Sequence, residues 1–285
     1  MIAATTPRRG VRQGLVALAG LLALGATMAT PAHARTAPAL ASASTRGGSI
    51  AIADAGAPDC LDPQKTALSA SNFVFANIVD PLFSVDEHGK IRPYLATGYT
   101  YNASGTEITI ALRHGVRFSN GDPFTASAVK YTFDRAVNPA TKSPASGSSL
   151  GTVTETQVVD PYTVRLVLKT PYRPLLVLAL TNSYLGILDP KVTTTCQNVI
   201  GTGPYKIQSV GPSYSTVTLV RNPYHTFAPA WGYNQGAPYL DKIVFRSILS
   251  DATTVSELLS GGVDLGGVTG TQVNRVGGNA RAIAY

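Results

Sequence analysis

The chain has 285 residues, with 23 Lys and Arg against 16 Asp and Glu and a formal net charge of +7. Three of the basic residues, Arg8, Arg9 and Arg12, lie in a segment that we expect to be removed on export, which leaves 20 of the 23 against 16 acidic residues. The remaining basic residues are scattered and form no run, so we expect no nucleic-acid partner. A chain of this length can bury one large hydrophobic core or two modest ones.

Residues 1–34 have the pattern of a secretory signal. The three arginines precede an uncharged, apolar run over residues 14–30, and an A-x-A sequence at 32–34 flanks a cleavage position. The apolar run is too short for a stable membrane span. The adjacent arginines leave general secretion and twin-arginine export both open, and no lipobox cysteine offers a lipid anchor. We therefore expect an extracytoplasmic protein, with residues 35–47, rich in Ala, Ser, Thr and Pro, as a flexible leader.

The chain contains two cysteines, Cys60 and Cys196. An even number of cysteines in an exported chain favours a disulfide, because oxidising compartments keep thiols paired. Two free buried thiols are the alternative. A metal site is not expected, because two cysteines without nearby histidines supply too few ligands.

Short strands and one helix are predicted for the first part of the chain. Residues 48–53 predict a strand, and residues 71–79 have helical spacing that an Asp-Pro pair ends. Apolar and polar residues alternate over 108–112, as in a half-buried strand. The turn that precedes this strand would pair it with residues 99–101 in a hairpin.

A turn and a longer helix follow. The sequence NGDP at 120–123 predicts a tight turn, and Thr125 is the expected N-cap of a helix that continues to Val137. The apolar face of this helix contains Ala126, Val129, Phe133 and Val137.

The second half of the chain continues to mix strands and helices. A second hairpin is predicted over residues 153–168, followed by a short apolar helix at 175–180. Further strands are predicted at 205–210, 216–221 and 242–248, and a helix at 253–259. Because no strict βαβ repeat appears, we expect a mixed α/β (α+β) fold with more than one sub-lobe.

The sequence contains no recognisable catalytic motif. It has no G-x-S-x-G elbow, no H-E-x-x-H pair, no Walker loop and no G-x-G-x-x-G fingerprint. The histidines outside the signal, His88, His114 and His225, are far apart in the sequence, so we expect surface or capping positions for them. No catalytic residue, metal ligand or cofactor is expected, and the chain is predicted not to be an enzyme.

Several blocks of the sequence occur in a recognisable order. The longest is LRHGVRFSNGDPFTASAVKYTFDRA at 112–136. The others are LDP at 61–63, NIVDPL at 77–82, GKIRPYLATGY at 89–99, DPYTV at 160–164, GTGPY at 201–205, RNPY at 221–224, PYLDKIVFRSILSDATT at 238–254 and GGVDL at 261–265. Together they resemble the extracytoplasmic solute-binding proteins of the peptide/nickel class, the oligopeptide/dipeptide-binding family that serves ABC importers.

The resemblance implies a periplasmic-binding-protein-like fold of two lobes joined by a hinge, with an extra domain inserted into the first lobe. It assigns residues 48–76 and 175–270 to lobe I, and residues 77–174 to the inserted domain. The longest block is then scaffold for the inserted domain and does not contact the ligand. Both cysteines fall in lobe I, which strengthens the prediction of a disulfide.

The resemblance also implies a ligand site and partners. It places Thr66, Ala67, Leu68 and Ser69 at the wall of a cleft, with Tyr184 as a second candidate near the hinge; core packing is the alternative for Tyr184. Some relatives carry an acidic residue in this loop, whereas this chain does not, so a charge-based contact is not expected. The implied ligand is a peptide or another small solute, since no histidine cluster favours nickel or haem. The implied partner is an ABC permease, and a monomer is expected.

The chain ends at Tyr285, soon after GGVDL, whereas the family continues into a second lobe. We therefore expect residues 271–285 to begin the crossing to a lobe II that is largely absent. This interpretation predicts a truncated product that is impaired in binding. The alternative is a secreted structural or interaction module that retains lobe I and the inserted domain. Saturable binding of a small ligand would favour the first interpretation, and a stable fold without such a ligand the second.

Overall fold

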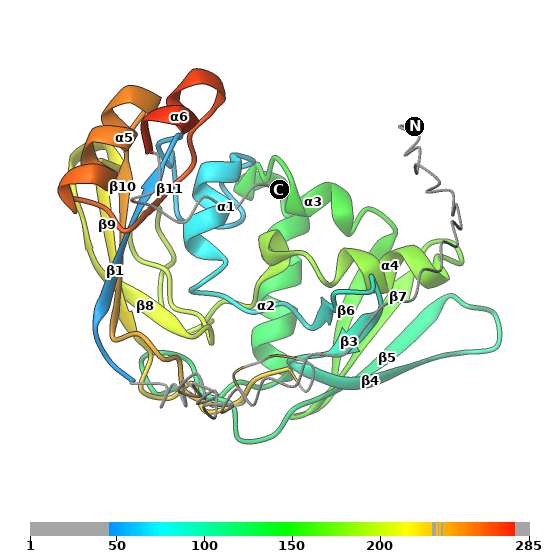
Figure 1. Cartoon of the computed structure of the whole chain (residues 1–285). Helices are drawn as coiled ribbons and strands as arrows, with labels where there is room; N and C mark the ends of the chain where they lie inside the picture. The colour runs from blue at the N-terminus through cyan, green and yellow to red at the C-terminus, as the bar shows by residue number, and fades with distance from the viewer. Residues whose placement is uncertain (1–45, 230–231, 233, 235, 277–285) are drawn as a thin grey trace, which may run out of the picture. The chain divides into compact units, whose positions relative to one another are not determined.

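The computed structural model describes residues 46–229, 232, 234 and 236–276 (Figure 1). The predicted signal lies outside these residues, as does the predicted leader except for Arg46 and Gly47. The described chain contains a five-stranded sheet, a four-stranded sheet and a two-stranded ribbon. This combination, together with the helices, confirms the predicted mixed α/β fold.

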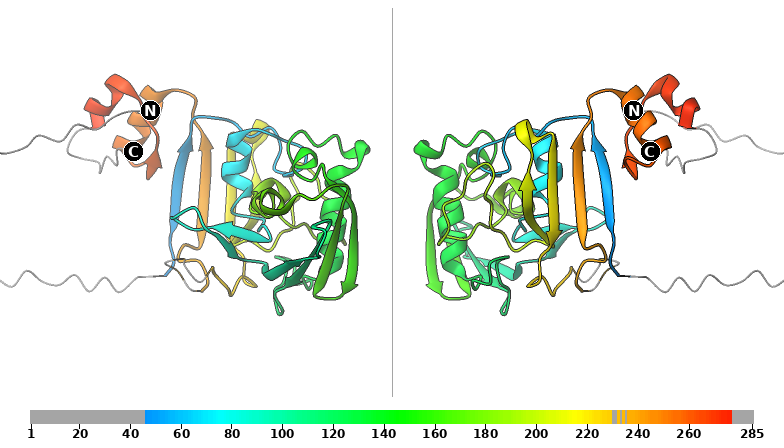
Figure 2. Two further views of the ribbon diagram at one scale, coloured as in Figure 1. Left: turned by 90° about the vertical axis from the view of Figure 1, so that its right-hand side faces the viewer. Right: turned by 90° about the vertical axis from the view of Figure 1, so that its left-hand side faces the viewer.

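The five-stranded sheet, called the mixed sheet below, contains strands far apart in the sequence. Its strands are β1 (Ser49–Asp54), β8 (Tyr205–Val210), β9 (Thr216–Arg221), β10 (Lys242–Ser247) and β11 (Leu265–Gly266). The spatial order is β11-β1-β10-β9-β8. β1 pairs in parallel with β10 and β11, whereas β9 pairs antiparallel with β10 and β8. Figure 2 shows β1 in blue beside β10 in orange.

One face of the mixed sheet forms a hydrophobic core with helix α1 (Ser69–Phe75). Alternation along the strands places Val217 opposite Phe245 and Leu219 opposite Ile243, and all four side chains are buried. Phe75 of α1 belongs to the same hydrophobic cluster. Helix α1 begins two residues before the predicted helix and ends earlier, and the chain continues as a turn toward Asp80.

The four-stranded sheet, called the antiparallel sheet, is built from the two predicted hairpins. Its strands are β4 (Ala96–Tyr101), β5 (Glu107–Leu112), β6 (Val153–Asp160) and β7 (Thr163–Leu168), in the order β4-β5-β7-β6. Ile108 lies opposite Leu166 and Ile110 opposite Val164, and these side chains are fully buried. The period-two pattern of the sequence therefore predicted the buried face correctly.

Helix α2 (Ala126–Val137) packs on β6 and β7 with Val129 and Phe133 in the core. Thr125 occupies the N-cap position as predicted, but its hydroxyl pairs with that of Ser127 at 2.8 Å and caps no backbone N–H. Val137 is 45% exposed, so it is not part of the buried face that the sequence predicted.

The remaining elements lie in the segments between these strands and after the last of them. They are β2 (Phe83–Val85), β3 (Ile91–Pro93), α3 (Ser146–Ser149), α4 (Arg173–Ala179), α5 (Asp251–Ser260), α6 (Val273–Val276) and the 3-10 turns η1 (Pro139–Thr141), η2 (Ser183–Leu185), η3 (Pro212–Tyr214) and η4 (Gly270–Gln272). Leu176, Val177 and Leu180, at and beside α4, share the hydrophobic cluster of the antiparallel sheet, although the resemblance assigns this segment to lobe I. The domain boundaries themselves stay a prediction.

The backbone of residues 201–205 crosses that of residues 77–78 at very short range. The N–H of Gly203 donates to the carbonyl of Ile78 at 2.9 Å, and that of Tyr205 donates to the carbonyl of Asn77 at 3.0 Å. A Cβ on Gly201 would lie 2.2 Å from the Ile78 oxygen, and one on Gly203 would lie 2.6 Å from the Ile78 carbonyl carbon. Only residues without a side chain permit this approach.

Asp80 lies in a buried polar cluster beside this crossing. Thr202 donates to its carboxylate at 2.8 Å, and Tyr94 forms a second side-chain hydrogen bond with it. Nδ1 of His225 lies 3.0 Å from the carbonyl of Thr202. His225 is only 5% exposed, so it does not lie at the surface, which was one of the two positions expected for it. Burial raises the pKa of Asp80, against the opposing effects of the His225 charge and of the hydrogen bonds from Thr202 and Tyr94.

We predict that Gly203→Ala lowers the free energy of unfolding by about 1–3 kcal/mol, because the added methyl must displace the backbone at Ile78. Chemical unfolding measures the change. Gly267→Ala is the matched control, since a Cβ there would meet nothing within 4 Å. Equal stability of the two variants would contradict the close crossing.

A second prediction concerns the pH dependence of stability. A carboxyl group whose pKa is raised in the folded state contributes fully to stability below its unfolded pKa, and this contribution is lost as the pH rises through the folded value. Asp80→Asn removes this titration and keeps an oxygen that can accept from Thr202 and Tyr94. We therefore expect the variant to gain stability relative to the parent as the pH rises from about 4 toward 7. Urea unfolding across that range measures the difference, and a difference that stays constant would show that burial does not raise this pKa.

Candidate functional site

The candidate site lies at one edge of the mixed sheet. Because β1 runs parallel to β10 and β11, the carboxyl ends of these strands meet at the same edge. The turn between β8 and β9 lies there too, since the Ser247 hydroxyl, at the end of β10, donates to the carbonyl of Tyr214 at 2.8 Å. In open α/β sheets, ligands bind outside the carboxyl ends of the strands. The loop after β1 and its neighbours are therefore the candidate site.

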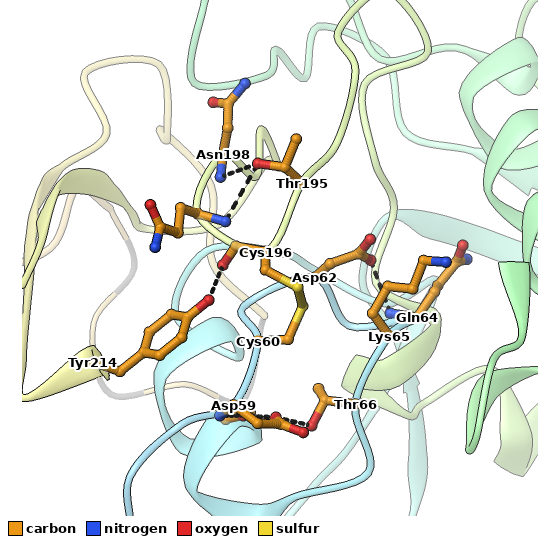
Figure 3. Close-up of a disulfide and its surroundings, with 12 residues drawn as sticks. Asp59, Cys60, Asp62, Gln64, Lys65, Thr66, Thr195, Cys196, Asn198 and Tyr214 are labelled. Carbon is orange, nitrogen blue, oxygen red and sulfur yellow. Dashed lines mark hydrogen bonds between the residues drawn. A yellow bond between two sulfur atoms is a disulfide. The ribbon is translucent and has the colours of Figure 1, made fainter. Parts of the chain in front are cut away.

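A disulfide between Cys60 and Cys196 anchors the loop after β1, as the sequence predicted (Figure 3). The N–H of Leu61 donates to the carbonyl of Cys196 at 3.0 Å, and the Tyr214 hydroxyl donates to the same oxygen at 3.1 Å. These contacts bring together three segments that are far apart in the sequence. The loop after β1 is thereby fixed against the turn that carries Tyr214.

The carboxylate of Asp59 lies beside the disulfide on this loop. Its Oδ1 accepts from the hydroxyl of Thr66 at 2.5 Å and from that of Ser71 at 2.8 Å. The backbone N–H of Asp59 donates to the Ser71 hydroxyl at 3.1 Å. Thr66 and Ser71 are buried, whereas Asp59 itself is exposed. The loop thus exposes a carboxylate to solvent, and the buried hydroxyls of Thr66 and Ser71 fix its position.

The structure places the predicted ligand-binding residues in two groups. Ala67, Leu68 and Ser69 are exposed, and the half-buried Tyr184 joins them by donating to the carbonyl of Leu68 at 3.2 Å. Thr66 is buried, and its hydroxyl is occupied by Asp59 and by the N–H of Leu68. The ligand-binding role of these residues stays a prediction.

The ring of Tyr184 has a second contact that bears on its role. It meets the ring of Phe75 edge to face, with centroids 5.2 Å apart. One side of the ring therefore packs on the core, and the hydroxyl reaches the loop of the candidate site.

Asp59 and Tyr214 were missed by the sequence analysis. The loop was expected to offer no acidic group because only the residues after LDP were considered, whereas Asp59 lies before it and folds back onto α1. No local sequence pattern identifies Tyr214, because only the folded chain brings this residue to the disulfide. Burial raises the pKa of Tyr184 and that of Tyr214, and the charge of Asp59 adds to both shifts; for Tyr214 a hydrogen bond with Gln197 acts in the opposite direction.

Large apolar side chains are exposed at the same edge. Leu68 is 47% exposed, Phe73 of α1 is 47% exposed, and Leu249, just after β10, is 75% exposed. Phe73 packs edge to face on Phe245, with ring centroids 5.4 Å apart. A carboxylate and tyrosines next to exposed apolar groups suit a ligand that has both a polar and an apolar part.

Two other kinds of site were sought in the described residues. No group of three or more His, Cys, Asp or Glu side chains among them is arranged to hold a metal ion. No helix in the described part of the chain is long and apolar enough to cross a membrane.

A family model described as "Bacterial extracellular solute-binding proteins, family 5 Middle" matches residues 90–282. This chain belongs to that family. A family of solute-binding proteins binds ligands without transforming them, so the prediction that the chain is not an enzyme is confirmed.

Curated relatives agree with this assignment. The glutathione-binding protein GsiB of Salmonella choleraesuis (strain SC-B67) is 31% identical over 206 residues, which are 70% of this chain and 38% of that protein. GsiB of Escherichia coli (strain K12) is 29% identical over the same length. The chain therefore spans 38% of the length of these relatives.

Solved structures confirm the periplasmic-binding-protein fold. The periplasmic binding protein DppA from Helicobacter pylori, in complex with the peptide STSA, superposes with a TM-score of 0.69 and 25% identity, over 81% of this chain and 49% of that one. The oligopeptide-binding protein AppA from Bacillus subtilis, in complex with a nonapeptide, has a TM-score of 0.71 and 20% identity, over 81% of this chain and 46% of that one. At 20% identity, the similarity to AppA is evidence for the fold alone.

We predict that replacing both cysteines, Cys60→Ser with Cys196→Ser, lowers the free energy of unfolding by about 2–5 kcal/mol, because the cross-link no longer restricts the unfolded chain. Chemical unfolding with and without a reductant measures the loss. The reduced parent serves as the control and should match the double variant. An unfolding midpoint that neither reduction nor substitution changes would refute this role of the disulfide.

Proposed function

We propose that this chain acts as the extracytoplasmic solute-binding component of an ABC importer and delivers a peptide or a related small solute to a membrane permease. The observation that carries the proposal is the family match over residues 90–282. The names of two similar proteins, a glutathione-binding protein and a periplasmic binding protein in complex with a peptide, favour short peptides as the ligand class. Export through the signal predicted in residues 1–34 fits this role.

The proposed ligand contacts lie in the loop after β1. Ala67, Leu68 and Ser69 are exposed and would contact the ligand directly, and Tyr184 would contribute its ring edge. Thr66 would act through Asp59, because its hydroxyl is already engaged. Peptides offer main-chain groups to such a wall, and ordered water can bridge the remaining polar contacts at little cost.

The proposed mechanism is closure of two lobes on a hinge, which buries the ligand and forms a joined surface for the permease. We retain the proposed division into lobe I at residues 48–76 and 175–270, with the inserted domain at 77–174. We also propose that the protein acts as a monomer and binds no nucleic acid, because its basic residues form no run.

The test of this function is ligand-dependent stability. We expect a mixture of di- to hexapeptides to raise the unfolding midpoint of the purified chain, because a ligand stabilises only the state that binds it. At a concentration of about 100 times Kd the gain is ~2.7 kcal/mol.

A mixture of free amino acids of the same composition is the control for nonspecific effects. A cooperative transition that peptides leave unmoved at every concentration would overturn the proposed function.

A further inference from the structure

A cavity of about 390 Å³ lies at the carboxyl end of α2. Its lining comes from the last residues of α2, from the segment around η1, from α3 and from the first residue of β6. The volume falls within the range of about 300–1,000 Å³ that is usual for small-molecule sites. None of the residues that line the cavity belongs to the loop after β1, so it shares no residue with the candidate site described above.

Apolar residues form part of the lining. Leu150 is fully buried and Val153 is half-buried. Val137 is 45% exposed, although it ends the apolar face that the sequence predicted for α2. It lines the cavity instead of packing in the core. An exposed apolar residue on a concave surface is available to the apolar part of a ligand.

The unpaired polar side-chain groups of the lining are hydrogen-bond donors. The ammonium group of Lys142 forms no hydrogen bond or ion pair with any residue that the structure describes. The side-chain oxygen of Asn138 accepts from the N–H of Ala140 at 2.9 Å, whereas its NH₂ group has no acceptor in the described part of the chain. The hydroxyls of Ser143 and Ser148 are engaged within their own loop. The cavity therefore has free donors for an acceptor group.

The backbone of Lys142 is held in an unfavourable conformation beside the cavity. Its φ of 51° and ψ of 45° lie in the left-handed region, which glycine adopts without strain and a lysine rarely adopts. The N–H of Lys142 donates to the carbonyl of Pro139 at 3.2 Å, and the ammonium group of Lys65 donates to the carbonyl of Thr141 at 2.6 Å. Strained backbone that its surroundings hold in this way is concentrated at functional sites.

The charges around the cavity are positive. No Asp or Glu occurs among the described residues that line it. Asp134, the acidic residue of α2, is paired with Lys130 at 2.8 Å. Lys65 brings a second ammonium group to the residue that precedes Lys142. An anionic group in the cavity would therefore meet a cation and no negative charge from the lining.

We propose that this cavity binds the carboxylate of a small ligand that also carries an apolar group. Lys142 and the NH₂ group of Asn138 are the donors, and Val137 and Pro139 contact the apolar group. A carboxylate has acceptor positions for both donors and forms a charge-assisted hydrogen bond with an ammonium group. One unpaired ammonium group in the lining balances the single charge of a monocarboxylate. The carboxylate belongs either to a free acid or to the C-terminus of a peptide.

The inference does not depend on the proposed solute-binding function, because the cavity shares no residue with the loop after β1. Its test uses the 15N-labelled parent chain and measures amide shifts of Lys142, Gly147 and Gly151. The probes are sodium 4-methylpentanoate and its neutral isostere, 4-methylpentanamide. Sodium chloride at equal ionic strength is the control for the effect of salt.

The central variant is Lys142→Met, which removes the charge and keeps an unbranched side chain at the same backbone position. Lys242→Met is the matched control, because Lys242 is also exposed and its side chain has no partner among the described residues. A further variant, Val137→Ser, changes an exposed apolar residue of the lining and leaves the donors in place.

We expect the parent and Lys242→Met to bind 4-methylpentanoate at least about tenfold more tightly than 4-methylpentanamide, and Lys142→Met to bind the two with similar affinity. Val137→Ser should weaken the binding of both probes by a similar factor, because it removes an apolar contact that the two share. N-acetyl-alanyl-leucine distinguishes the two sources of the carboxylate. If it binds as tightly as 4-methylpentanoate, the site accepts the C-terminus of a peptide; if it binds more weakly, the site takes free acids.

Several results would overturn the inference, and the first two need only the parent chain. They are shifts with 4-methylpentanoate that do not exceed those with sodium chloride, equal binding of the acid and the amide, an unchanged preference for the acid in Lys142→Met, and shifts that centre on residues 67–69 instead of the cavity. None of these results bears on the peptide-dependent stability that tests the proposed function.

Discussion

The buried ion pair between Asp62 and Arg135 is the constraint on which the arrangement of the two sheets depends. Asp62 is 1% exposed, and Arg135 reaches it from α2 with two hydrogen bonds while donating a third, at 2.6 Å, to Gln64. A buried carboxylate that loses its partner costs ~3–5 kcal/mol. The Gln64 amide also donates to the Thr132 carbonyl at 2.7 Å. The loop after β1 and the helix on the antiparallel sheet therefore have to stay together.

This ion pair also restricts the residues that precede Asp62 in the same loop. Asp62 is tied to α2, and Cys60 is tied to Cys196 by the disulfide, so the short stretch between them has little freedom. Asp59 immediately precedes that stretch, and Ser71 holds it against α1. The candidate site at this edge of the mixed sheet would therefore owe its rigidity to contacts outside the residues that are proposed to bind the ligand. For a solute-binding protein, such rigidity keeps the cost of ordering the site out of the binding free energy.

Local patterns in the sequence predicted the elements well. The alternation through Ile108 and Ile110 identified the buried face of the antiparallel sheet, because the two-residue period of a strand appears directly in the sequence. Helix α2 was predicted for the same kind of reason, although Thr125 does not cap it with its side chain. The burial of His225 was not predicted. That residue is isolated in the sequence, and only the folded chain brings the carbonyl of Thr202 to its ring.

The sequence by itself determined the mixed α/β class, the solute-binding family and the two cysteines available for a disulfide, because composition, periodicity and ordered motifs are properties of neighbouring residues. It also pointed to the loop that contains Leu68 and Ser69. Only the tertiary structure decided that Tyr184 and Tyr214 are joined to the loop that carries Asp59. These three residues come from segments far apart in the chain, and their meeting depends on how the parallel strands, the disulfide and the buried ion pair bring those segments to one edge of the sheet.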